Sequence, residues 1–147
     1  EYLDGRIYDG DFARGHRSGF GKMIYPNGDV YEGEWKMDNY EGRGKLVLRR
    51  AGQMEGFFRM GALHGEGTRT YADGRVFQGT FYHGERKKGK MTYTFEEWYE
   101  GEWLDGWMHG HGFMKWRNGN TYRGSWVKGV RFVYHSYISS NMTTKYF

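Results

Sequence analysis

The sequence predicts an all-β protein, built as an elongated, twisted, single-layer antiparallel sheet of successive β-hairpins. Three observations carry this prediction. A five-residue pattern recurs in steps of 23, 23, 23, 22 and 23 residues, and self-similarity at a short fixed period is typical of repeat architectures. Aromatic and polar residues alternate within the pattern, which indicates strands. Asn-Gly and Asp-Gly pairs lie between the alternating runs, where they favour hairpin turns.

The first strand of each repeat is best seen in "YEGEW", which occurs at Tyr31 and again at Tyr99. A large apolar residue opens each repeat: Tyr8, Tyr31, Met54, Phe77, Tyr99 and Tyr122. A glycine follows two residues later and a second aromatic residue four residues later. Successive strand residues point to opposite faces, so both rings and the glycine share one face. Glycine weakens a strand, and we therefore expect rings from neighbouring strands to lie across it.

The second half of each repeat predicts the second strand of a hairpin. A turn glycine such as Gly61 comes first, and a Gly-x-Gly element such as Gly65 to Gly67 follows it. Another alternating stretch then leads to a tight turn, as at Asn27-Gly28. No segment has a helical period, so we expect successive hairpins to join into one meandering sheet of about six repeats.

Two domains of unequal regularity follow from this pattern. Residues 1–129 form the repeat array, with repeats starting at 8, 31, 54, 77, 99 and 122. Residues 1–7 copy the end of a repeat, so we expect the array to continue before residue 1. The fourth repeat is one residue short and lacks both the Gly-x-Gly element and the Asn/Asp-Gly turn that closes the other repeats, so we expect a distorted hairpin. Residues 130–147 diverge and are interpreted as a segment that caps the array or binds a partner.

Composition and motifs point away from catalysis. Catalytic and phosphate-binding motifs are absent, and the many acids occupy solvated strand positions. His109 and His111 share a strand face, but His64 takes the same repeat position as His109, which favours a structural role. The chain has no cysteine, which removes thiolate zinc sites and weakly favours an intracellular protein. We predict a protein that is not an enzyme and has no catalytic residue, no cofactor and no metal. The net charge of only +4 makes nucleic acid an improbable partner.

The stretch "YEGEWKMDNYEGRGK" resembles the MORN repeat (membrane occupation and recognition nexus), whose pattern is Tyr-x-Gly-x-Trp, Gly-x-Gly, then Asn/Asp-Gly. The similarity extends from Tyr2 to about Gly129. It implies a groove-shaped single-layer β array. It also implies a scaffold in a cytoskeletal, ciliary or membrane-associated assembly. The implied location is the cytoplasm, the cytoskeleton, the cilium or the periphery of a membrane.

A single-layer sheet raises the question of what covers its aromatic face, since the sequence offers no second layer. We expect an exposed apolar groove there, and large exposed apolar patches mark partner sites. A helical peptide of another protein or a second copy of the chain, in a homodimer, would fill it. The predicted groove residues on the first strands are Trp35, Phe58, Phe81, Trp103 and Trp126. Those on the second strands are Tyr25, Leu48, Tyr71, Tyr93 and Trp116.

Two alternatives remain open. A peripheral membrane adaptor would bind anionic phospholipid through the densest basic cluster, Arg86, Lys87, Lys88 and Lys90, because each such charge near a membrane surface contributes about 1 kcal/mol. After Asp105 the sequence contains no acid, which gives this hypothesis further support. The array would otherwise be the targeting module of a longer enzyme, since the family's repeats accompany lipid kinases and methyltransferases.

Overall fold

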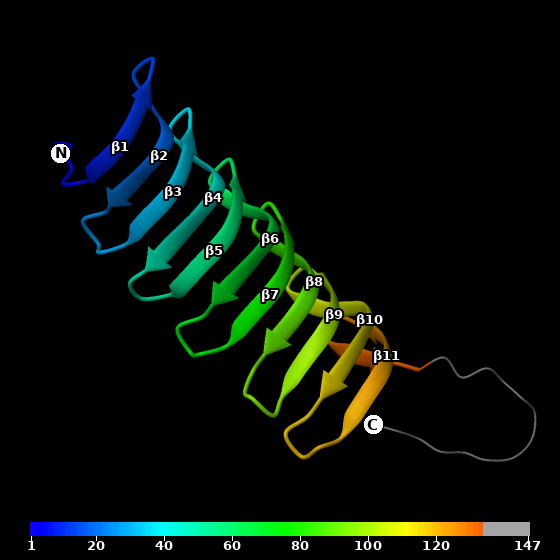
Figure 1. The fold of residues 1–147 in the computed structure, drawn as a ribbon. Coiled ribbons are helices and arrows are strands. Elements are labelled where there is room, and N and C mark those ends of the chain that lie inside the picture. Colours follow the sequence, from blue (N-terminus) through cyan, green and yellow to red (C-terminus); the bar gives the residue numbers. More distant parts are fainter. Residues whose placement is uncertain (134–147) are drawn as a thin grey trace, which may run out of the picture.

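The computed structural model describes residues 1–133, and it confirms the predicted fold class. Twelve strands form one antiparallel sheet whose spatial order is the order along the chain. Figure 1 shows β1 to β11 side by side along an elongated ribbon, with the turns on its two long edges. No helix is present among these residues, and each strand pairs only with its neighbours in sequence.

The strands are short and nearly uniform in length. Their bounds are β1 Ile7–Ala13, β2 His16–Ile24, β3 Val30–Lys36, β4 Asn39–Leu48, β5 Gly52–Arg59, β6 Ala62–Thr70, β7 Val76–Tyr82, β8 Glu85–Thr92, β9 Trp98–Leu104, β10 Trp107–Lys115, β11 Thr121–Val127 and β12 Val130–Phe132. Two-residue turns join each odd strand to the next even strand. Both turn residues have positive φ, as at Met60 (49°) and Gly61 (86°), which is the type I′ geometry that matches strand twist.

A row of glycines crosses eleven strands of the sheet. In successive strands the register aligns Gly10, Gly21, Gly33, Gly44, Gly56, Gly67, Gly79, Gly89, Gly101, Gly112 and Gly124. A Cβ added to Gly44 would lie 2.3 Å from the Tyr31 hydroxyl, so a ring from the neighbouring strand does lie over this glycine as predicted. A Cβ on Gly33 would lie 2.4 Å from the Gly44 Cα. That backbone contact was not predicted, and it also excludes a side chain.

The sheet bends sharply along this glycine row. Directly after β2, Tyr25 lies four residues past Gly21, on one side of the glycine row. On β3, Trp35 lies two residues past Gly33, on the other side of the row, and Tyr40 on β4 pairs with it. On a flat sheet six positions would separate their backbones by about 20 Å along the strands. The hydroxyls of Tyr25 and Tyr40 are nevertheless hydrogen-bonded to each other. The two arms of the sheet therefore fold toward each other with the aromatic face inside, and we call this the inner face.

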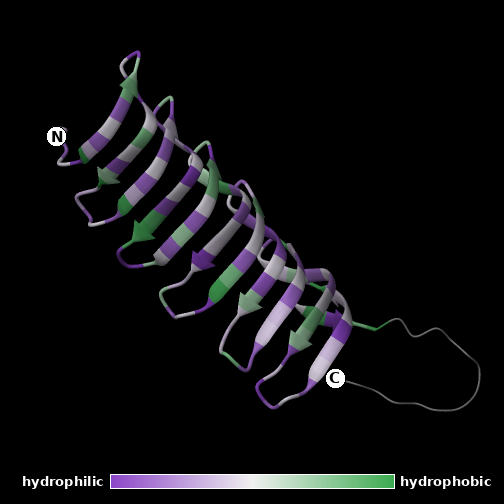
Figure 2. Ribbon diagram, viewed as in Figure 1, coloured by the Kyte–Doolittle hydropathy of each residue, from purple (hydrophilic) through white to green (hydrophobic). Residues whose placement is uncertain are grey.

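The folded inner face is the hydrophobic core. Its buried residues are Met23, Tyr31, Trp35, Leu46, Phe58, Leu63, Phe77, Phe81, Met91, Tyr99, Trp103, Met114 and Trp126. Tyr31 shows the packing: its ring stacks on Tyr40 at 3.7 Å and meets Trp35 edge to face at 5.1 Å. Its hydroxyl donates a hydrogen bond to the Glu34 carbonyl at 2.8 Å. Burial raises the pKa of Tyr31 well above its usual value and that of Tyr99 to about 12. Figure 2 shows hydrophilic residues alternating with neutral or hydrophobic ones along several of the strands.

The two glycines of each Gly-x-Gly element have different roles. The second belongs to the glycine row, whereas the first has positive φ, as at Gly42 (68°), beside a bulge in the β3–β4 register. At this bulge the Arg43 backbone N–H donates to the Glu34 carboxylate at 2.9 Å. Asp11 and Glu102 accept equivalent bonds in the first and fifth repeats. These acids, predicted only as solvated strand residues, therefore satisfy a backbone group that the bulge leaves unpaired.

The irregular fourth repeat remains part of the continuous sheet. β7 and β8 pair from Val76↔Thr92 to Tyr82↔Glu85 with a single irregularity, between Thr80 and Phe81. The turn without glycine is closed by a bond from the Tyr93 N–H to the Glu97 carbonyl at 3.0 Å. At the C-terminal end β12 pairs with β11. The predicted capping segment of residues 130–147 lies mostly outside the described residues, and its role stays a prediction.

Candidate functional site

The first row of predicted groove residues lies in the core. Trp35, Phe58, Phe81, Trp103 and Trp126 are each 5% exposed or less. Trp35, for example, packs against the rings of Tyr8, Tyr31 and Tyr40 and donates its indole N–H to the Gly21 carbonyl at 2.9 Å. The expectation that this row is exposed is wrong, because the sheet folds along the glycine row and covers the face without a second layer.

The second row of predicted groove residues lies at the mouth of the fold, where the two arms meet. Tyr25, Leu48, Tyr71, Tyr93 and Trp116 are all partly buried and pack against the core. They contact residues of the opposite arm. The Tyr71 hydroxyl accepts a hydrogen bond from the Arg86 guanidinium at 2.5 Å, and the ring centroids of Trp116 and Trp126 are 6.4 Å apart. Whether this row binds a partner stays a prediction.

The predicted basic cluster does not form one surface. Arg86 lies on the inner face, with its guanidinium 4.5 Å from the Trp103 ring centroid. Lys87 pairs with Glu85 at 3.0 Å. Lys88 and Lys90 lie on the opposite, outer face, in register with Glu102 and Glu100 on the neighbouring strand. The irregularity in the β7–β8 register leaves Lys87 as an extra residue, and this turns Arg86 to the face opposite that of Lys88 and Lys90. Cross-strand acids offset the lysine charges. Binding of anionic lipid by these four residues stays a prediction.

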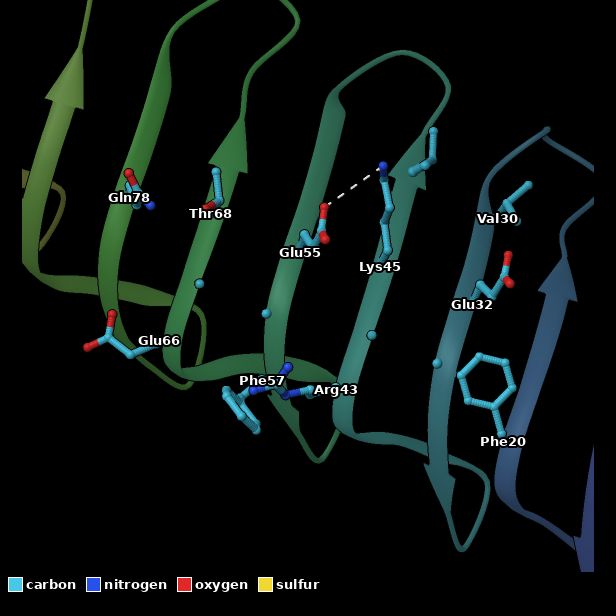
Figure 3. A pocket seen from close by; sticks show the side chains of 15 residues that line it. Phe20, Val30, Glu32, Arg43, Lys45, Glu55, Phe57, Glu66, Thr68 and Gln78 are labelled. Atoms are coloured by element: carbon cyan, nitrogen blue, oxygen red, sulfur yellow. Dashed lines mark ion pairs between the residues drawn. The ribbon is translucent and has the colours of Figure 1, made fainter.

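The outer face carries an open trough that the sequence reading did not anticipate. Its volume is about 730 Å³, and its floor is formed by Gly33, Gly44, Gly56 and Gly67. Figure 3 shows the side chains that stand on either side of this floor. Phe20 and Phe57, which are 57% and 41% exposed, stand on one side, and Val30 and Val47 stand on the other. The trough therefore combines exposed apolar groups with a floor that leaves the backbone open.

A ladder of alternating charges runs along one side of the trough. The register aligns Asp9, Lys22, Glu32, Lys45 and Glu55 on five successive strands. Lys22 and Glu32 are 3.6 Å apart, and Lys45 and Glu55 are 3.9 Å apart. Opposite charges in directly opposed positions stabilise a sheet. Each repeat of 23 residues contains two strands, so the repeat pattern relates a given position only to every second strand. The ladder joins adjacent strands, and only the register of the folded sheet shows which of their residues are opposite each other.

A second trough of about 570 Å³ lies further along the outer face, over the fifth and sixth repeats. Trp98 and Phe113 line it, with ring centroids 5.2 Å apart. Lys90 lies 4.1 Å from the Trp98 ring, and the Arg123 guanidinium lies 5.0 Å from the Phe113 ring. The irregular fourth repeat lines the ends of both troughs, with Gln78 in the first and Lys88 and Gly89 in the second.

One charged cluster has a structural role at the first two repeats. Asp38, at the β3–β4 turn, accepts a hydrogen bond from the Arg17 backbone N–H at 2.9 Å and pairs with the Arg17 and His16 side chains. The bond with His16, followed by the two bonds from Arg17, holds the pKa of Asp38 far below its usual value. Arg17 in turn lies 4.7 Å from the Trp35 ring. The cluster joins the first repeat to the second.

The described residues offer little for metal or membrane chemistry. Among residues 1–133, no group of three or more His, Asp or Glu side chains is placed to hold a metal ion. His109 and His111 are accordingly not joined there by a third such ligand. Within the same residues, no helix has the length and apolar character needed to cross a membrane.

Comparison with known proteins agrees with the repeat seen in the structure. The family model described as "MORN repeat" matches residues 8–30, 31–49, 55–74 and 99–121. Together these matches cover more than half of the chain. A search of curated proteins gave no match. The third repeat matches from Glu55, one residue after Met54, and the irregular fourth repeat is not matched.

Proposed function

The chain belongs to the MORN-repeat family, whose repeats are in general non-enzymatic modules that bind proteins or membranes, and we propose that it is a non-catalytic scaffold that binds another protein. The observation that carries this proposal is the outer trough over the glycine row, where exposed phenylalanine and valine side chains flank a charge ladder. Its setting is an intracellular one, in a cytoskeletal, ciliary or membrane-associated assembly.

The trough has the dimensions of a peptide site. It extends over six strands, from Phe20 on β2 to Gln78 on β7, which corresponds to about 24 Å at the usual strand spacing. An extended segment of about seven residues has this length. Because the ladder is nearly neutral overall, the apolar groups contribute most of the affinity, and the alternating charges fix the position of the partner. Aromatic side chains are enriched at such contacts.

The experiment begins with affinity purification of partners and then measures the affinity of the identified partner by calorimetry. Phe57→Asp places a charge in the trough, and we expect it to weaken binding at least tenfold, about 1.4 kcal/mol. Phe95→Asp is the matched control, because Phe95 is 89% exposed in a turn away from the trough. Equal losses from both variants, or no loss from Phe57→Asp, would contradict the proposal.

The same partner tests the two earlier hypotheses. Trp116→Leu probes the inner-row prediction, since it removes ring surface at the mouth of the fold while keeping an apolar side chain. Vesicles with and without anionic lipid, at two salt concentrations, probe membrane binding, because binding driven by exposed charges weakens as salt rises. Protein binding that persists in the absence of vesicles, and that depends on Phe57, is the expected result.

A further inference from the structure

An arginine occupies a core position on the inner face of the third repeat. The equivalent positions of the second strands hold Met23, Leu46, Arg69, Met91 and Met114. The Arg69 side chain donates no hydrogen bond within residues 1–133, and its buried Nε has no partner there. Burying an unpaired polar group costs free energy. The other repeats show that this position packs well with Met or Leu, so packing does not explain the arginine.

A second arginine lies beside it, across the mouth of the fold. Arg86 donates to the Tyr71 hydroxyl at 2.5 Å and to the Gly106 carbonyl at 2.9 Å. Its guanidinium also lies 4.5 Å from the Trp103 ring. Its Nε is buried and has no partner in the described part of the chain. A guanidinium has five N–H donors, so these two bonds hold Arg86 in place and leave donors free.

Arg69, Arg86 and Tyr71 line one pocket of about 310 Å³, together with Met54 and Phe81. The only acid that lines it is Glu85, which already pairs with Lys87 at 3.0 Å. Neither pocket arginine forms an ion pair within residues 1–133. The pocket therefore holds two fixed positive charges against aromatic walls, with unused donors, and its one lining carboxylate is paired with Lys87.

Arg75 shows what a paired arginine at this place looks like. Its guanidinium lies 5.1 Å from the Tyr71 ring, as close as that of Arg69 at 5.2 Å. Unlike Arg69, it pairs with a carboxylate of the chain, Asp73, at 2.7 Å. The Tyr71 ring thus contacts Arg75, which forms an ion pair with Asp73, and also Arg69 and Arg86, which form no ion pair within residues 1–133.

We propose that this pocket binds the carboxylate of an Asp or Glu side chain from an acidic segment of a partner protein that lies along the mouth of the fold. Arginine binds a carboxylate through parallel N–H bonds, which are strong where water is excluded. Charge complementarity supports this occupant: within residues 1–133 the charged members of the inner strand rows are Arg17, Arg69, Arg86 and Arg131. The site is separate from the outer trough and does not depend on it.

The position of the pocket favours a protein side chain over a lipid headgroup. Its two guanidinium groups lie among Tyr71, Phe81 and Met54 between the folded arms. A side-chain carboxylate on a flexible stem enters such a space, whereas a flat bilayer surface stays outside it. Phosphate has the same charge complementarity, so the experiment needs a separate arm for it.

Selection from a random twelve-residue peptide library displayed on phage tests the site without a known partner. We expect the wild-type protein to enrich peptides that share one Asp or Glu flanked by apolar residues. Arg69→Gln and Arg86→Gln should each weaken binding of a selected peptide at least tenfold. Arg75→Gln is the matched control and should stay within twofold. Thermal melting verifies that each variant is folded, and Arg86→Lys, which keeps the charge but loses the planar fork, should give an intermediate loss.

Two further measurements assign the contact to this pocket. Replacing the peptide's acid by its amide should weaken wild-type binding tenfold and leave binding to Arg86→Gln unchanged. The arginine Nε–H resonances of Arg69 and Arg86 should shift when the acidic peptide is added. The proposal would be overturned if the selection enriched no acidic peptides, if Arg75→Gln weakened peptide binding as much as the pocket variants, or if the arginine resonances did not shift. It would also be overturned if only Phe57→Asp, in the outer trough, weakened binding of the selected peptides. Shifts with inorganic phosphate or phosphatidylserine vesicles, but not with acidic peptide, would replace it with a phosphate site.

Discussion

The substitution Gly44→Ala tests the role of the glycine row directly. The new Cβ would lie 2.3 Å from the Tyr31 hydroxyl oxygen and 2.7 Å from the Tyr31 Cζ. Unstrained contacts between such atoms are about 3.5 Å, so the ring has to move by about 1 Å. Overpacking of this kind costs about 1–3 kcal/mol. The move also breaks the 2.8 Å bond from the Tyr31 hydroxyl to the Glu34 carbonyl, which contributes about 1 kcal/mol.

We therefore expect Gly44→Ala to lower the free energy of unfolding by about 2–4 kcal/mol in urea titrations followed by circular dichroism and tryptophan fluorescence. Gly74→Ala is the control: Gly74 has φ of +89° but no heavy atom within 4 Å of an added Cβ. It should cost only backbone strain, about 1 kcal/mol. In Tyr31→Phe the nearest atom is gone, so the double variant should lose about 1 kcal/mol less than the sum of the two single variants. Additive losses, or a Gly44→Ala variant as stable as wild type, would refute the reasoning.

Two other predictions concern charged groups. Glu102→Ala should cost about 1–2 kcal/mol, because it leaves the His111 backbone N–H without its carboxylate acceptor, whereas Glu100→Ala on the same strand should stay within about 0.5 kcal/mol; urea titrations that reverse this order would contradict the bulge assignment. The folded-state pKa of Asp38 is depressed, so its contribution is present above its unfolded pKa of about 3.9 and is lost as the pH falls further. Asp38→Asn should thus melt below wild type at pH 7, and the gap should close with falling pH; a gap independent of pH would show that ionisation of Asp38 is irrelevant.

The period of the sequence was enough to predict the hairpins, their order and the shared face of Tyr31, Gly33 and Trp35. Alternation shows which residues share a face, but it does not show how that face curves. The curvature arises from the close approach of Gly33 and Gly44 and from the rings that lie over them. These contacts depend on cross-strand register, which is a property of the folded sheet. The predicted exposed groove was therefore wrong for the row that begins at Trp35.

Other features of the site did leave a signal in the sequence. Arg69 interrupts a row of Met and Leu residues, and aligning the repeats by their glycines is enough to reveal it. The acids Asp11, Glu34 and Glu102 share one position in the repeat and precede Gly-x-Gly elements by the same distance. Their constant spacing is a signal of a structural role, although they were predicted only as solvated strand residues. The group that each acid binds, a backbone N–H at a bulge, became evident only from the register of the sheet.

The repeat architecture explains how one repeat can carry a charged pocket without loss of the array. Each strand pairs only with its neighbours in sequence, so stability is close to a sum of terms within repeats and terms between neighbouring repeats. Arg69 lies among residues of the third and fourth repeats, where Met54, Phe81 and Arg86 line the same pocket. The tyrosine–tryptophan pairs that begin at Tyr31 and Tyr99 lie in other repeats. A single-layer sheet can thus combine an outer surface that extends along its length with a binding pocket confined to one pair of repeats.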